Sequence, residues 1–196
     1  NLINKNMTNQ KFAFIDVDTT GLDEKEHDVI QFACIVTDSE LNELGRIRLE
    51  MQPTKDNAEA QAMEKTGLTV EQIMAYADTS ATGYAKLITF LGQFVNKYEK
   101  KDKLQFVAYN ALFDCKFVRE WFSRNDDVYF GSWFWWPPIC VMMEGAWLVR
   151  NNRASFIDFK LQTLCEAADI VWDETKAHDA MYDIEQTIQL YRYLSE

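Results

Sequence analysis

The sequence lacks an apolar run long enough to cross a membrane, and it also lacks a secretory signal. A spanning helix needs about 20 consecutive apolar residues, whereas the stretch WFWWPPICVMM at residues 133–143 is shorter and contains a pair of prolines. Residues 1–10 have no apolar core of the kind that a signal peptide requires. The chain is therefore not expected to span a membrane, and a cytoplasmic location is predicted.

Cysteine is scarce, and the cysteines are scattered along the chain. The four are Cys34, Cys115, Cys140 and Cys165, with no CxxC pair and no short even spacing among them. This pattern argues against a disulfide framework and against a cysteine zinc site. The four thiols are predicted to be reduced and to lie in or near the core.

Basic residues are too few to balance the acidic ones. The chain has 20 Lys and Arg against 31 Asp and Glu, which gives a formal net charge of −11. This balance argues against a protein that grips long nucleic acid by releasing many counterions. It leaves room for an enzyme that holds a short end locally, and bound divalent ions would offset part of the negative charge.

The 196 residues suffice for one packed domain in which strand and helix patterns alternate. Apolar runs predict strands at residues 11–16, 29–38, 43–51 and 104–109, with a hairpin formed by the second and third. Spacings of three and four predict helices at residues 69–77, 82–100, 111–124, 159–169 and 180–194. Residues 137–149 predict a last short strand and the start of a helix, and residues 52–68 a long connecting loop. The fold class is α/β.

Two aspartates stand at the end of the first predicted strand. Asp16 and Asp18, in DVDTTGL, are two residues apart, so on a strand both carboxylates point to the same side of the sheet. Like charges on a buried face repel, and a raised pKa or a bound cation relieves the repulsion. We favour the cation, although an Asp-Thr-Gly sequence is also ordinary turn chemistry. Asp114 adds a third acid in the first turn of a predicted helix, where the helix dipole alone would favour it.

The segment HDAMYD contributes a histidine and a further acid. His178 and Asp183 are five residues apart, which is about 140° around a helix. Both cannot face one ion if both are helical, so His178 is predicted on a loop and Asp183 in the second turn of the last helix. Asp183 would then join Asp16 and Asp18 around one ion, and Asp114 would help to hold a second. All-oxygen sites of this kind favour Mg²⁺ or Mn²⁺.

Two such ions can stabilise the attacking and the leaving oxygen of an in-line displacement at phosphorus. The attacking water needs a base, and a histidine on a loop suits that role. Of the two histidines, His27 and His178, the second lies in the acid-containing segment HDAMYD that also supplies Asp183. We therefore expect His178 to be the base.

Three motifs occur in a fixed order along the chain: DVDTTG, NALFD and HDAMYD, at residues 16–21, 110–114 and 178–183. With them the chain resembles the DnaQ-like, or DEDDh, 3′-5′ exonucleases of the ribonuclease H-like fold, which carry D-x-E-T-T-G, N-x-x-F-D and H-x-A-x-x-D. The resemblance covers residues 12–194, and KLQTLCEAADI is similar to the helix that precedes the last family motif. Three motifs in order form a specific signal.

The resemblance implies a central mixed sheet of about five strands with an N-terminal antiparallel hairpin and flanking helices. Residues 1–10 are expected to be an N-terminal extension, and residues 11–196 an exonuclease domain. Met7 is a candidate native start, which would make the residues before it an addition from cloning or processing.

The resemblance also implies the reaction and the site. The enzyme would hydrolyse single-stranded DNA or RNA from the 3′ end to nucleoside 5′-monophosphates, with two Mg²⁺ or Mn²⁺ ions. The implied metal ligands are Asp16, Asp18, Asp114 and Asp183, with His178 as the general base. The implied substrate-binding residues are Thr19, Thr20, Gly21, Leu22, Asn110 and Phe113, and Lys176 is the best placed cation for a phosphate.

Asp18 departs from the family pattern, which has Glu at this position. The change keeps the charge but shortens the reach by one methylene. Two alternatives therefore stay open: a module that binds nucleic-acid ends with weakened or lost turnover, and a proofreading subunit of a polymerase assembly. The sequence also leaves open DNA against RNA and the oligomeric state, including a homodimer. The aromatic cluster Trp133–Trp136 is either a stacking platform for bases or ordinary packing.

Overall fold

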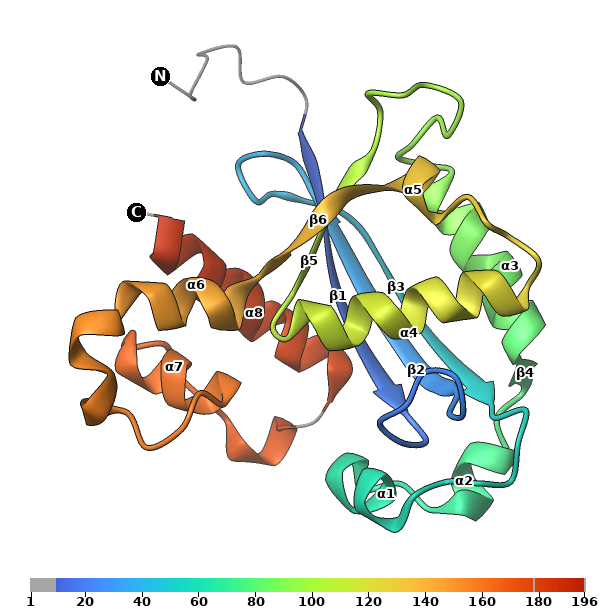
Figure 1. The fold of residues 1–196 in the computed structure, drawn as a ribbon, viewed down its shortest axis with the longest axis horizontal. Helices are drawn as coiled ribbons and strands as arrows, with labels where there is room; N and C mark the ends of the chain where they lie inside the picture. Colours follow the sequence, from blue (N-terminus) through green and yellow to red (C-terminus); the bar gives the residue numbers. More distant parts are fainter. Residues whose placement is uncertain (1–9, 178, 196) are drawn as a thin grey trace.

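A six-stranded mixed sheet forms the centre of the molecule in a computed structural model that describes residues 10–177 and 179–195. The strand order is β4-β3-β2-β1-β5-β6 (Figure 1). β1 to β3 are antiparallel neighbours, β5 and β6 run parallel to β1, and β4 runs parallel to β3. The strands are β1 (Lys11–Thr19), β2 (Val29–Thr37), β3 (Glu43–Gln52), β4 (Asp78–Thr79), β5 (Leu104–Ala108) and β6 (Phe134–Cys140).

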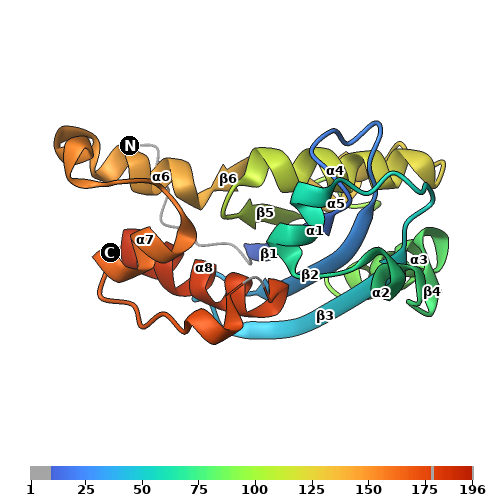
Figure 2. The ribbon, with the colours of Figure 1, turned by 90° about the horizontal axis from the view of Figure 1, so that it is seen from below.

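Helices cover both faces of the sheet, as Figure 2 shows from below. One face packs against α3 (Ser80–Leu91), α4 (Ala111–Arg124) and α5 (Phe130–Trp133). The other packs against α6 (Val141–Leu148), α7 (Leu161–Ala167) and α8 (Ala180–Ser195). The short α1 (Ala60–Thr66) and α2 (Val70–Met74) follow β3 along the chain. 3₁₀ turns occupy Arg150–Ser155 and Glu174–Lys176. No helix within the described ranges is long and apolar enough to cross a membrane.

The α/β fold with its N-terminal hairpin is confirmed, and several predicted boundaries are wrong. The connection at 52–68 contains α1, a seven-residue helix whose single buried residue, Met63, gives no periodic signal. The helix predicted at 82–100 runs from Ser80 to Leu91, because a capping box at Thr79 starts it earlier and turns replace it after Gly92. β1 continues through both aspartates to Thr19, and the sheet has six strands because the two-residue β4 joins it.

The alternation of β1 decides which side chains can reach the site. Ala13, Ile15 and Val17 enter the core on the α4 face, whereas Phe14 packs in the core on the α8 face. Asp16 and Asp18 share the side of Phe14 because side chains alternate along a strand. Both aspartates therefore lie at the carboxyl end of a central strand and on the side where α8 packs. Sites of α/β sheets commonly form at this edge.

Candidate functional site

One strand and two helices carry the predicted acids to the end of β1: β1 itself, α4 and α8. Asp114 lies in the first turn of α4, is only 4% exposed, and accepts a hydrogen bond of 3.1 Å from the backbone N of Val17. This bond fixes the carboxylate beside the strand residue that lies between Asp16 and Asp18. Asp183 approaches from the first turn of α8, not the second as predicted, because it is only the fourth residue of a helix that begins at Ala180, as predicted.

The charges of these carboxylates act on one another. Burial, and then the charges of Asp114, Asp18 and Asp183, raise the pKa of Asp16 well above its usual value. Burial raises the pKa of Asp114 to about 7, against the opposing effect of the hydrogen bond from Val17. Asp18, Asp114 and Asp183 thus all lie within electrostatic reach of Asp16.

Two cations temper the site from outside the predicted motifs. Burial raises the pKa of Asp18 to about 6, and the charges of Lys65 and Arg48 oppose the rise. Lys65 lies on α1 and opposes the shifts of Asp16 and Asp114 as well. Neither cation is predicted from the sequence as a site residue, because Lys65 falls in the predicted connection at 52–68 and Arg48 lies on β3, which β2 separates from β1.

The chemistry of this donor set fits a hard divalent cation. Carboxylate oxygens are the ligands that Mg²⁺ and Mn²⁺ prefer, and crowded buried carboxylates are stabilised by a positive ion. The arrangement is looser than a finished ligand shell: in the described part of the chain, no three acidic, histidine or cysteine side chains form a group compact enough to hold an ion as they stand.

The last motif divides its acids between two roles. Asp179 caps the start of α8: its Oδ1 accepts hydrogen bonds from the backbone N of Met181 at 3.1 Å and of Tyr182 at 3.0 Å. Its Oδ2 pairs with Nη1 of Arg48 at 2.6 Å, which ties α8 to β3. Asp183, one turn further on, is left to act on Asp16. His178, the predicted base, lies outside the described residues.

A pocket of about 300 Å³ opens beside Asp18. Of the predicted substrate-binding residues, Thr19, Gly21, Leu22 and Phe113 line it. Its other wall belongs to α1 and the residue before it, which the sequence predicts only as part of a long connecting loop that could lie over a site: Glu59, Gln61, Ala62, Glu64, Lys65 and Thr66. The Thr-Gly pair at 66–67, where Gly67 has a φ of 67° and ends α1, is the sequence signal that could have located this helix.

Three predicted substrate residues are not among those that line the pocket. Thr20 is fully buried and stabilises the loop between β1 and β2. Its hydroxyl accepts a hydrogen bond from the backbone N of Asp28 at 3.0 Å. Asn110 is exposed just before α4. Lys176 is exposed, lies 3.8 Å from Asp173 and sits 5.9 Å from the ring centre of Tyr182.

The aromatic cluster splits into an inner and an outer half. Trp133 and Phe134 are buried in the core on the α4 face, so packing explains them. Trp136 is 65% exposed, and the guanidinium of Arg119 on α4 lies 5.6 Å from the centre of one of its rings. An exposed indole beside a cation is suited to stack on a base. Ordinary packing therefore fits Trp133 and Phe134, and the stacking interpretation stays open for Trp136.

Comparisons with known proteins show the family of the chain. The sequence pattern of a family described as exonuclease matches residues 13–191. Ribonuclease T of Haemophilus influenzae (strain PittGG) is 27% identical over 197 residues, which cover 93% of this chain and 78% of the relative. Exodeoxyribonuclease I of Escherichia coli (strain K12) is 28% identical over 206 residues, which cover 96% of this chain and 41% of the relative.

Solved structures of exonuclease I share the fold. The zinc-bound E. coli exonuclease I complex with single-stranded DNA superposes with a TM-score of 0.77 at 25% identity, covering 96% of this chain and 41% of that one. The complex with a dT13 oligonucleotide gives a TM-score of 0.76 at 25% identity, with 95% and 41% covered. The chain thus spans about two fifths of exonuclease I.

Proposed function

Because the chain belongs to the exonuclease family, we propose that it removes nucleotides one at a time from the 3′ end of single-stranded DNA or RNA and releases nucleoside 5′-monophosphates. The predicted family, its ribonuclease H-like fold and its exonuclease activity are confirmed by the match and the relatives. Exonucleases of this fold generally use divalent metals. The direction of attack on this substrate, the ions and the residues that act are our proposal.

The observation that supports the proposal is that Asp18, Asp114 and Asp183 lie within electrostatic reach of Asp16, beside a pocket of about 300 Å³. Asp16, Asp18 and Asp183 would hold one Mg²⁺ or Mn²⁺, and Asp114 would help to hold a second. When bound, such ions supply the charge that stabilises the attacking and the leaving oxygens of a phosphodiester.

The chain's own residues would place the substrate. Leu22, 65% exposed at the pocket, and Phe113 offer apolar surfaces for the terminal base and sugar. Lys65 offers a positive charge to a phosphate group in a pocket whose other charged lining residues, Asp18, Glu59 and Glu64, are acidic. His178 remains the proposed general base, and Lys176 a proposed phosphate contact.

A longer strand must leave the pocket over the surface of the protein. We place its next bases near Trp136 and Arg119, where the exposed indole and the guanidinium meet. Exonuclease I, solved with single-stranded DNA, supports a single-stranded substrate. The relatives include both a ribonuclease and an exodeoxyribonuclease, so the proposal covers both nucleic acids. The cytoplasmic location, the oligomeric state and the division into residues 1–10 and 11–196 stay predictions.

A 5′-labelled single-stranded oligonucleotide tests the proposal. Incubation with Mg²⁺ or Mn²⁺ should give a ladder of products shortened by single nucleotides from the 3′ end, and excess EDTA should stop it. A strand whose 3′ hydroxyl is blocked by a bulky group is the matched control substrate and should resist cleavage. Binding without any ladder would favour the end-binding module, and immediate loss of the 5′ label as a mononucleotide would contradict the proposed direction.

A further inference from the structure

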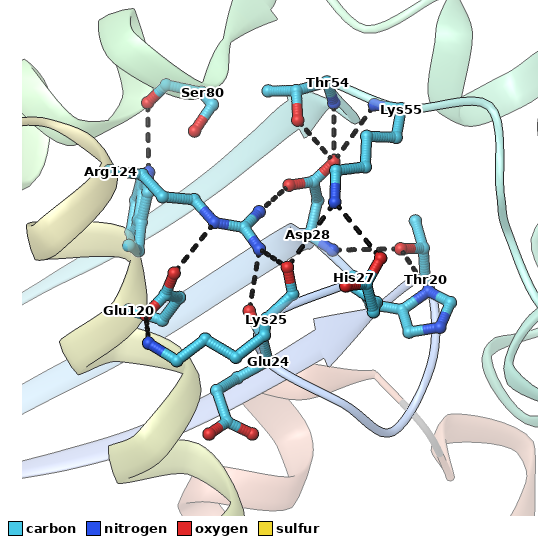
Figure 3. A network of polar contacts seen from close by, with 12 residues as sticks. Thr20, Glu24, Lys25, His27, Asp28, Thr54, Lys55, Ser80, Glu120 and Arg124 are labelled. Atoms are coloured by element: carbon cyan, nitrogen blue, oxygen red, sulfur yellow. Dashed lines mark hydrogen bonds and ion pairs between the residues drawn. The ribbon is translucent and has the colours of Figure 1, made fainter.

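A buried ion pair lies behind the pocket and has no part in the site described so far (Figure 3). Asp28, just before β2, is 4% exposed, and its Oδ1 pairs with Nη1 of Arg124, the last residue of α4. Its Oδ2 accepts three hydrogen bonds, from N and Oγ1 of Thr54 at 2.7 and 2.8 Å and from N of Lys55 at 3.2 Å. The buried charge is thus fully compensated, and it joins the loop after β1, the chain after β3, and α4.

The guanidinium of Arg124 grips the loop backbone as well as the carboxylate. Its Nη2 donates to the carbonyl oxygens of Glu24 at 2.7 Å and Lys25 at 2.9 Å, while its Nε donates to Oε1 of Glu120 at 3.3 Å. A planar fork can serve these acceptors at once from fixed directions, which a lysine ammonium on a flexible stem does not reproduce. The loop between β1 and β2 is therefore tied to the far end of α4.

His27 extends the same connection to α1. The imidazole is buried, with Nδ1 3.3 Å from Oγ1 of Thr20 and Nε2 3.0 Å from Oε1 of Glu59. The backbone N of Glu59 donates to the carbonyl oxygen of Thr20 at 2.7 Å. A Cβ added to Gly21 would lie 2.5 Å from the ring atoms of His27, so the loop packs tightly against this side chain.

The segments joined in this way are the walls of the nucleotide pocket. Thr19, Gly21 and Leu22 of the loop form one wall, residues 59–66 form the second, and Phe113 of α4 contributes the third. Asp28 and Arg124 themselves are not among the residues that line the pocket. They can influence a bound nucleotide only through the walls that they hold.

We propose that the Asp28–Arg124 pair is a positioning device that keeps the three pocket walls at the spacing required by a 3′-terminal nucleotide. The proposal rests on the proposed function. The argument for it is the location of the hydrogen-bond partners. A pair that only anchored α4 would not need contacts with two separate loop backbones, at residues 24–25 and 54–55, both of which lead to pocket walls. Walls ordered before binding spare the substrate the entropy of ordering them, so loss of the pair weakens binding and leaves the chemical step intact.

Arginine variants test this device without touching the pocket. Arg124→Gln removes the fork and the charge, and Arg124→Lys keeps the charge but removes the fork. Arg46→Gln is the matched control, because Arg46 also bridges two acids, Glu43 and Glu185, but joins β3 to α8 instead of the pocket walls. All are assayed with a single-stranded oligonucleotide in Mg²⁺ at a temperature where circular dichroism shows each variant fully folded.

We expect Arg124→Gln to raise KM roughly 5- to 20-fold, as loss of one or two hydrogen bonds would, with kcat within about twofold of the parent. Arg124→Lys should recover much of the lost Tm but little of the lost affinity, and it is the variant to rely on if Arg124→Gln does not fold. Arg46→Gln should keep the KM of the parent whatever its Tm.

The proposal is overturned if folded Arg124→Lys has the KM of the parent, or if Arg46→Gln raises KM as much as the Arg124 variants do. A parent that cleaves normally under either outcome leaves the proposed function standing. If the parent cleaves nothing, the proposed function fails, and the device is judged instead by the Kd for a fluorescein-labelled single strand in EDTA. Weaker binding in the Arg124 variants alone supports it, and equal binding refutes it.

Discussion

Replacing Asp114 by Asn should make the ion-free protein more stable. Asn keeps an oxygen that can accept the hydrogen bond from Val17 but removes a buried negative charge. The pKa of Asp114 is raised from 3.8 to about 7. This shift of about three units, at about 1.4 kcal/mol each, is a cost to the folded parent of about 4 kcal/mol. The cost is absent below the unfolded pKa, grows between the two pKa values and is complete above the folded one.

The gain from Asp114→Asn should therefore be about 4 kcal/mol at pH 8 and should fall to less than half of that at pH 5, where much of the cost has not yet developed. Urea unfolding in EDTA at both pH values measures it. The matched control is Asp28→Asn: both aspartates are 4% exposed, but Asp28 is paired with Arg124. Breaking that buried pair should destabilise the fold by about 3 to 5 kcal/mol. An Asp114→Asn variant no more stable than the parent at pH 8, or a gain that does not shrink on acidification, would refute the reasoning.

Four further predictions concern the active site. Asp16→Ala should abolish Mn²⁺ binding in calorimetry, and undiminished uptake would remove Asp16 from the ligand set. His178→Ala should bind ions nearly as the parent does but lose roughly 10²- to 10⁴-fold in kcat; a variant as fast as the parent would exclude His178 as the base. Asp18→Glu should raise the rate if the shorter acid limits it, whereas a fall would mean that the pocket has adapted to Asp. Trp136→Ala should raise KM for a ten-nucleotide strand about tenfold, the worth of one stacked base, but not for a dinucleotide. Trp147→Ala, which removes another exposed indole that packs beside an arginine, is the control and should change neither.

The parts of the fold that the sequence predicts well are those set by local pattern. The helix at 111–124 is predicted with both its ends, because its apolar spacing is regular and a strand leads directly into it. Asp16 and Asp18 lie on β1 next to its end, close to the predicted strand end, and strand alternation puts two such residues on one side. Both follow from periodicity and need no knowledge of what lies across the molecule.

The parts that escape prediction depend on contacts between distant segments. α1 has one buried residue, so no periodic apolar pattern identifies it as a helix. Its Lys65 comes close to the acids only in the folded chain. Asp28 and Arg124 are 96 positions apart and carry no motif that would link them. The Trp133–Trp136 cluster is one aromatic run in the sequence, yet Trp133 and Phe134 are buried in the core and Trp136 is exposed.

The contrast between Asp28 and Asp114 explains how one fold can hold a rigid pocket and a reactive site next to each other. The two side chains are chemically the same and equally buried, so the difference lies in the donors around them. Asp28 receives an arginine and three further hydrogen bonds, and the result is a fixed junction between loops. The hydrogen bond from Val17 only partly offsets the cost of burying Asp114, beside further carboxylates, so its negative charge is costly until a cation arrives. In the proposed metal site, the stability given up at Asp114 would contribute affinity for a divalent ion, while in the proposed positioning device the pair at Asp28 would keep the neighbouring pocket in shape.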